Sequence, residues 1–144
     1  MTTNSEKAVK YFKQGYNCAQ AVFLTYAPEY GIDEEMALKL SSSFGGGMGR
    51  LREVCGAVSS MFAIAGLKHG YSTINDEIKK EHCVLIQKMA EEFKSKHNTI
   101  ICRELLNLED GSSNPTPEKR TKSYYENRPC ENFIMTACEI IDTY

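Results

Sequence analysis

A chain of 144 residues, 42% apolar and 25% charged, has the composition of an ordinary globular domain that can bury a core without disulfide bonds. Its formal net charge of −2 does not favour binding to nucleic acid or to an anionic membrane surface. The N-terminal stretch MTTNSEKAVK contains no apolar segment, so we expect no signal peptide. The longest nearly apolar run, at 54–67, is too short to cross a membrane. We therefore expect a cytoplasmic protein without membrane insertion.

Helical periodicity and capping residues predict three helices in the first third of the chain. The expected helices cover 5–14, 17–26 and 33–44, and their capping residues are Ser5, Asn17 and Asp33. Gly15 stops the first helix, and the glycines at 45–47 end the third.

The rest of the chain predicts four more helices. The helix at 52–68 is apolar on nearly every side, which is typical of a helix in the middle of a bundle. Further helices are expected at 73–96, from Thr99 to near Asn107, and from Pro129 onward. The polar stretch 107–128 is interpreted as a long loop, a feature that is usually functional or disordered. No strand is evident, so we predict one all-α domain over 1–144, a bundle of six or seven helices.

Six cysteines are unusual for a cytoplasmic chain, because a reducing compartment disfavours structural disulfides. Four of them fall at the starts of separate predicted helices, namely Cys18, Cys55, Cys102 and Cys130. The positive end of a helix dipole stabilises a thiolate, the form that attacks disulfides and binds metals. Arginines that could act in the same direction are Arg50, Arg52, Arg103 and Arg128. Cys83 and Cys138 lie inside predicted helices and are interpreted as packing thiols.

Five short motifs accompany these cysteines: GYNCAQAV at 15–22, FGGGMG at 44–49, CGAVSS at 55–60, CRELL at 102–106 and C-x-x-F-I at 130–134. Together they resemble the C-GCAxxG-C-C family of redox-active proteins, over nearly the whole chain. The four signature cysteines of the family fall on the four helix-start cysteines, whereas the last glycine of its C-G-A-x-x-G motif is Ser60 here. The resemblance implies redox activity. Because members often lie near transporter genes, it also implies a transport-related partner.

Three functions are compatible with the sequence. The first is thiol–disulfide exchange, with Cys55 as the attacking thiolate and the plausible pairs Cys18–Cys55 and Cys102–Cys130. The second is a zinc or iron–sulfur site on the same four thiolates, Cys18, Cys55, Cys102 and Cys130. The third is a non-catalytic module that binds a small ligand or a partner of a transport system. The redox partner is not defined by the sequence, and association into a homo-oligomer is compatible with each function.

Overall fold

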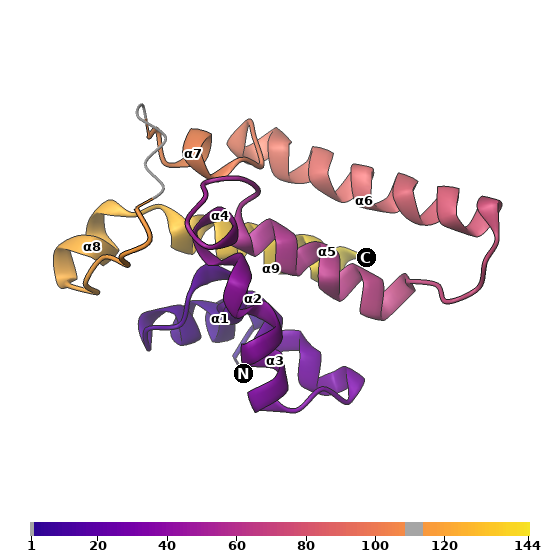
Figure 1. Cartoon of the computed structure of the whole chain (residues 1–144), viewed down its shortest axis with the longest axis horizontal. Helices are drawn as coiled ribbons and strands as arrows, with labels where there is room; N and C mark the ends of the chain where they lie inside the picture. The colour runs from indigo at the N-terminus through magenta and orange to yellow at the C-terminus, as the bar shows by residue number, and fades with distance from the viewer. Residues whose placement is uncertain (1, 109–113) are drawn as a thin grey trace.

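The computed structural model describes residues 2–108 and 114–144, and it confirms the all-α bundle (Figure 1). Six of the described helices have eight or more residues: α1 (Asn4–Lys13), α2 (Cys18–Tyr26), α3 (Glu34–Ser41), α5 (Gly56–His69), α6 (Asp76–His97) and α9 (Cys130–Thr143). The shorter helical segments are η1 (Ala27–Tyr30), η2 (Ser42–Phe44), α4 (Gly45–Met48), α7 (Cys102–Leu105) and α8 (Lys122–Asn127). Within the described ranges the only β-type pairing is an isolated antiparallel bridge between Val54 and Ile101.

Helix α5 is the centre of the bundle, as its apolar sequence predicts. It packs against α2 and α9, with α1 against both of these, and α6 runs beside it (Figure 1). Val58, Met61 and Ile64 of α5 are completely buried. Burying each side chain of this size stabilises the fold by about 1.5–3 kcal/mol. Within 2–108 and 114–144, no helix combines the length and the apolar composition needed to cross a membrane.

Two of the three predicted caps are confirmed. The Asn17 side chain accepts a hydrogen bond from the Gln20 N–H, and the Asp33 side chain accepts one from the Met36 N–H. The first helix, however, is capped by Thr3 and not by Ser5. The reason is local, because Glu6 stands three residues after Thr3 and completes a reciprocal capping box.

The central helix begins four residues later than predicted, at Gly56 instead of near Arg52. The backbone explains the difference, since Arg50 and Arg52 adopt left-handed φ angles of 66° and 63° and cannot continue a helix. Val54 is then held extended by its bridge to Ile101. Similarly, the third helix ends at Ser41, so the glycines at 45–47 do not cap it directly.

Three further expectations need correction. The polar stretch 107–128 is not all loop, because α8 forms within it, capped by Thr121; residues 109–113 lie outside the described part. The helix expected from Thr99 begins only at Cys102, and the Thr99 hydroxyl accepts a hydrogen bond from the Ile101 N–H before it. The helix expected at 73–96 begins at Asp76, as α6, and its buried residues are Met89 and Phe93, towards its C-terminus.

Candidate functional site

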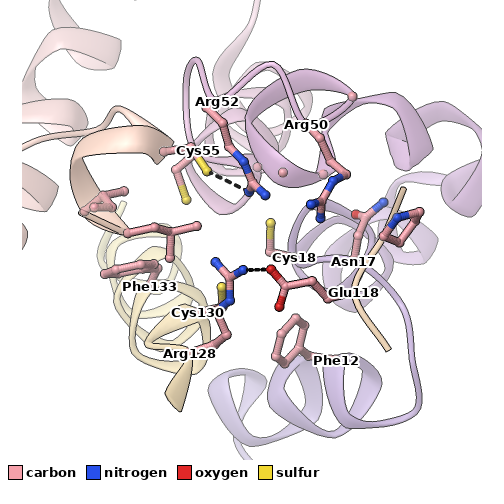
Figure 2. Close-up of a pocket in the computed structure, with 18 of the residues that line it drawn as sticks. Phe12, Asn17, Cys18, Arg50, Arg52, Cys55, Glu118, Arg128, Cys130 and Phe133 are labelled. Atoms are coloured by element: carbon pink, nitrogen blue, oxygen red, sulfur yellow. Dashed lines mark hydrogen bonds and ion pairs between the residues drawn. The ribbon is translucent and has the colours of Figure 1, made fainter. Parts of the chain in front are cut away.

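The four helix-start cysteines line one cavity of about 280 Å³ (Figure 2). Cys18, Cys102 and Cys130 are the first residues of α2, α7 and α9. Cys55 differs slightly from the prediction, because it immediately precedes α5 instead of lying in its first turn. The remaining two cysteines lie elsewhere: Cys83 is exposed on α6, and Cys138 is fully buried in α9. The fold therefore brings together the thiols that sequence reasoning selected.

Backbone hydrogen bonds between two distant segments place Cys55 beside Cys102. The Cys55 N–H donates to the Ile100 carbonyl at 2.8 Å, and the Cys102 N–H donates to the Glu53 carbonyl at 2.6 Å. These bonds join the residues before α5 to the residues before α7, on either side of the Val54–Ile101 bridge. Two helix starts that are far apart in sequence thus face the same cavity.

Two glycines permit the close approach of these segments. A Cβ atom on Gly56 would lie 2.7 Å from the Cys18 Sγ atom, and one on Gly47 would lie 2.7 Å from the Cys102 Cβ atom. Gly47 also has a φ angle of 71°, which favours glycine over any residue with a side chain. A hydroxyl strengthens the α2–α5 contact, since the buried Ser60 Oγ donates to the Ala19 carbonyl at 2.7 Å.

Cys18 and Cys55 form a hydrogen-bonded pair with opposite pKa changes. The hydrogen bond from Cys55 lowers the pKa of Cys18 to about 6, and backbone N–H groups of Gly46, Ala19 and Ala57 act in the same direction against the effect of burial. The same hydrogen bond, together with burial, raises the pKa of Cys55 well above its usual value. Near neutral pH the pair therefore holds one proton, with Cys18 as the thiolate and Cys55 as the thiol.

These pKa changes favour Cys18 as the thiolate, whereas the sequence favours Cys55. Arg52, although close to Cys55 in sequence, interacts with a different cysteine: its Nη1 atom lies 3.6 Å from the Cys102 Sγ atom. Backbone N–H groups of three residues, Gly46, Ala19 and Ala57, stabilise negative charge on Cys18 at the start of α2, and those of Val58 and Ala57 do so on Cys55. The low-pKa position depends on contacts between α2, α4 and α5, which the local sequence around Cys55 does not encode.

Cys102 and Cys130 are thiols at neutral pH. Burial raises the pKa of Cys102, and the nearby Arg52 guanidinium opposes that rise only in part. Burial, reinforced by the negative charge of Cys18, raises the pKa of Cys130 to about 12, with Arg128 acting in the opposite direction. The cavity thus contains one thiolate and three thiols.

The arginines near the cysteines divide into two groups. Arg50, Arg52 and Arg128 line the cavity, and their guanidinium groups point into it (Figure 2). Arg103 does not line it; its Nη2 atom donates instead to the Leu51 carbonyl and to the Glu53 carboxylate.

Arg120 and Glu118 are site residues that sequence reasoning missed. Arg120 lies 4.4 Å from the Phe12 ring centroid and donates to the Phe12 and Tyr16 carbonyls at 3.1 and 3.0 Å. Glu118 forms an ion pair with Arg128. No nearby motif identifies these two residues as site residues. Arg120 is positioned by contacts with residues more than a hundred positions away, and Glu118 is positioned by the path of the polar stretch.

The four thiols do not form a ready-made metal centre. Across the described ranges, no group of three or more Cys, His, Asp or Glu side chains is arranged so that it could hold a metal ion. The cysteines line a cavity of about 280 Å³. A Cys₄ zinc or iron–sulfur site would require the side chains or their helix ends to move.

Fold and site together define a class: an all-α protein that gathers four cysteines from four helix starts around one cavity. The chain belongs to the C_GCAxxG_C_C family, described as putative redox-active protein, which matches residues 16–144. This match confirms the resemblance found in the sequence and its general redox character. No curated protein and no solved structure matches the chain.

Proposed function

We propose that this protein carries out thiol–disulfide exchange, with Cys18 as the attacking thiolate and Cys55 as the resolving thiol. The observation that carries the proposal is the hydrogen-bonded Cys18–Cys55 pair, in which the pKa of Cys18 is lowered to about 6. A thiolate that exists at neutral pH beside a protonated thiol is the arrangement needed for a two-step exchange.

In the first step, the Cys18 thiolate attacks one sulfur of a substrate disulfide. A sulfur–sulfur bond forms between Cys18 and the substrate, the substrate disulfide breaks, and one substrate thiolate leaves. In the second step, Cys55 attacks the Cys18 sulfur of this mixed disulfide and gives its proton to the second leaving group. The substrate disulfide gains two electrons, and the protein is left with a Cys18–Cys55 disulfide that an external dithiol reduces.

The pKa changes of the pair suit this order of events. In the resting state, the pKa of Cys55 is raised by its hydrogen bond to the Cys18 thiolate. In the mixed disulfide, Cys18 carries no negative charge, so this contribution to the pKa of Cys55 disappears. Cys55 therefore becomes easier to deprotonate when it is needed as the second nucleophile.

Cys102 and Cys130 take no part in these two steps. Their raised pKa values keep them protonated in the same cavity, where they remain candidates for a second exchange with the Cys18–Cys55 disulfide. The pairing of Cys102 with Cys130 is the version of this second exchange that the sequence suggests.

The test is oxidation of the reduced protein with a limiting amount of a small disulfide, followed by alkylation of free thiols and peptide mapping. We expect a Cys18–Cys55 disulfide in the native protein, and a mixed disulfide that accumulates on Cys18 in the Cys55→Ser variant. Cys83→Ser, which changes an exposed thiol outside the cavity, is the matched control and should behave as the native protein does.

Two results would contradict the proposal. In one, Cys18 stays reduced while other cysteines react. In the other, protein purified without oxygen contains stoichiometric zinc or iron, and binding of this metal depends on the four cavity thiols. That result would favour the metal-binding hypothesis.

A further inference from the structure

Most of the arginines of the chain line the cavity, and the thiol–disulfide exchange proposed above does not need so many. The chain contains five arginines, and four of them line the cavity: Arg50, Arg52, Arg120 and Arg128. No lysine lines it. Guanidinium groups differ from lysine ammonium groups in their planar, two-pronged geometry, which matches a carboxylate or a similar planar anion.

The positive charge of Arg50 and Arg120 is only partly offset by the described residues of the cavity. Glu118 is the one carboxylate among the described lining residues, and it pairs with Arg128. The Arg50 Nε atom donates to the Asn114 carbonyl at 2.8 Å, and the Arg120 guanidinium donates to two backbone carbonyls. Backbone carbonyls orient a guanidinium group without neutralising its charge. An anion that enters the cavity would do so.

Arg50 is the clearest candidate for a contact with a ligand. Burial and the neighbouring charge of Arg52 lower its pKa, as expected for cations that crowd one another. The leading influences on the pKa of Cys18 are another thiol, burial and backbone N–H groups, and no arginine is among them. The Arg50 guanidinium points into the cavity that Cys18 also lines (Figure 2).

The depth of the thiols favours a small molecule over a protein as the ligand. Cys55 and Cys102 are only 5% and 7% exposed. The cavity volume of about 280 Å³ lies just below the range of about 300–1,000 Å³ that is usual for small-molecule sites. Cys18, the proposed attacking sulfur, is only partly exposed, which favours a small disulfide over one on the surface of a folded protein.

We propose that the cavity binds a small disulfide that carries carboxylate groups, with Arg50 as the principal contact for a carboxylate and Cys18 as the sulfur that attacks. This inference rests on the proposed thiol–disulfide function and adds the class of substrate. The chemistry is the two-step exchange given above: one dianionic disulfide becomes two thiol-containing carboxylates, and the protein gains the Cys18–Cys55 disulfide.

A matched series of alkyl disulfides tests the charge requirement. The series consists of 3,3′-dithiodipropionate, bis(2-hydroxyethyl) disulfide and cystamine, which are dianionic, neutral and dicationic. The measurement is the rate of Cys18 oxidation by each compound, divided by its rate with a free thiol in solution. We expect the dianion to exceed the neutral compound by about 10-fold or more, because a cavity in which positive charges outnumber negative ones concentrates anions. The advantage should shrink as salt is added.

Three variants locate the charge. Arg50→Gln should remove most of the preference for the dianion, whereas Glu118→Gln should increase it. Arg103→Gln is the matched control, since it removes the one arginine that does not line the cavity, and it should leave the preference unchanged. Equal corrected rates for the three disulfides, or a preference that survives in Arg50→Gln, would overturn this inference while leaving the proposed exchange intact.

Suberate separates a failure of the inference from a failure of the proposed function. It has the same length and charge as 3,3′-dithiodipropionate, with two methylene groups in place of the two sulfurs, so it can bind but cannot react. We expect suberate to bind to the native protein in calorimetry and to bind more weakly to Arg50→Gln. Binding of suberate without oxidation of Cys18 by any disulfide would overturn the exchange and retain the anion site. Absence of suberate binding would overturn the anion site itself.

Discussion

Two stretches that follow each other directly in the chain, residues 46–55 and helix α5, differ in backbone, burial and chemistry. In the first, Met48, Arg50 and Arg52 all have left-handed φ angles, each of which costs about 1–2 kcal/mol for a residue with a side chain. In α5, the backbone is regular, and the side chains of Val58, Met61 and Ile64 are fully buried. The first stretch shapes the cavity and the second stabilises the fold. Changes confined to one of them should therefore leave the other largely unaffected.

The largest expected effect on stability comes from the core of α5. Met61→Ala should lower the free energy of unfolding by about 2–5 kcal/mol, because it removes a fully buried side chain and leaves a cavity. Urea denaturation measures this loss. Leu67→Ala, in the same helix but at a position that is 38% exposed, is the control and should cost less. The thiolate absorbance of Cys18 near 240 nm should still titrate with its midpoint at about pH 6 in Met61→Ala. A large change in that midpoint would mean that core and cavity are coupled.

The second effect is a pH dependence of stability that arises in the cavity. The pKa of Cys18 in the folded protein, about 6, lies below its ordinary value of 9.0. The folded state therefore releases this proton first, and the stabilisation is complete above about pH 9 and is lost as the pH falls through about 6. Between these limits the contribution should rise by about 1.4 kcal/mol per pH unit at most.

The measurement is the free energy of unfolding from pH 6 to pH 8.5, in native protein and in Cys18→Ser. The difference between the two should grow with increasing pH, because titration of groups other than the pair largely cancels. Below about pH 9 the raised pKa of Cys55 adds little, since Cys55 is protonated in both the folded and the unfolded states. A difference that stays constant with pH, or shrinks as the pH rises, would show that Cys18 is not the group with the lowered pKa.

The same contrast explains how much of the molecule the sequence could predict. Helix α5 follows from local rules, since an apolar sequence on all sides needs only burial to be stable as a central helix. The caps of α2 and α3 also depend on residues three positions apart and are recognisable in the sequence. The left-handed angles of Arg50 and Arg52 are not, because arginine normally avoids them and only tertiary contacts impose them.

The candidate site was predictable in its cysteines but not in its electrostatics. Four thiols at helix starts form a pattern that can be recognised without a structure. The choice of Cys18 over Cys55 as the thiolate depends on backbone N–H groups that come from three segments. Arg120 reaches the site from the polar stretch through carbonyls of residues 12 and 16, and neither partner carries a sequence signal for that contact.

The smallest expected effect on stability, and the one that tests the boundary between the two stretches, comes from Gly56, the first residue of α5. A methyl group there would lie 2.7 Å from the Cys18 Sγ atom and 2.8 Å from the Phe44 carbonyl oxygen. Gly56→Ala should therefore lower the free energy of unfolding by about 1–3 kcal/mol through overpacking. It should also raise the pKa of Cys18, because displacing this sulfur weakens the hydrogen bonds that stabilise its thiolate.

Gly66→Ala is the matched control, since it makes the same substitution in the same helix where an added methyl group meets no atom within 4 Å. It should be neutral or stabilise the protein by up to about 1 kcal/mol, because alanine restricts the unfolded chain more than glycine does. The decisive comparison is the pKa of Cys18 in the two variants, measured by thiolate absorbance. If Gly56→Ala destabilises the fold but leaves this pKa unchanged, close contact with α5 is not what lowers the pKa of Cys18. In that case the N–H groups of α2 and the 46–55 stretch are sufficient to stabilise the thiolate.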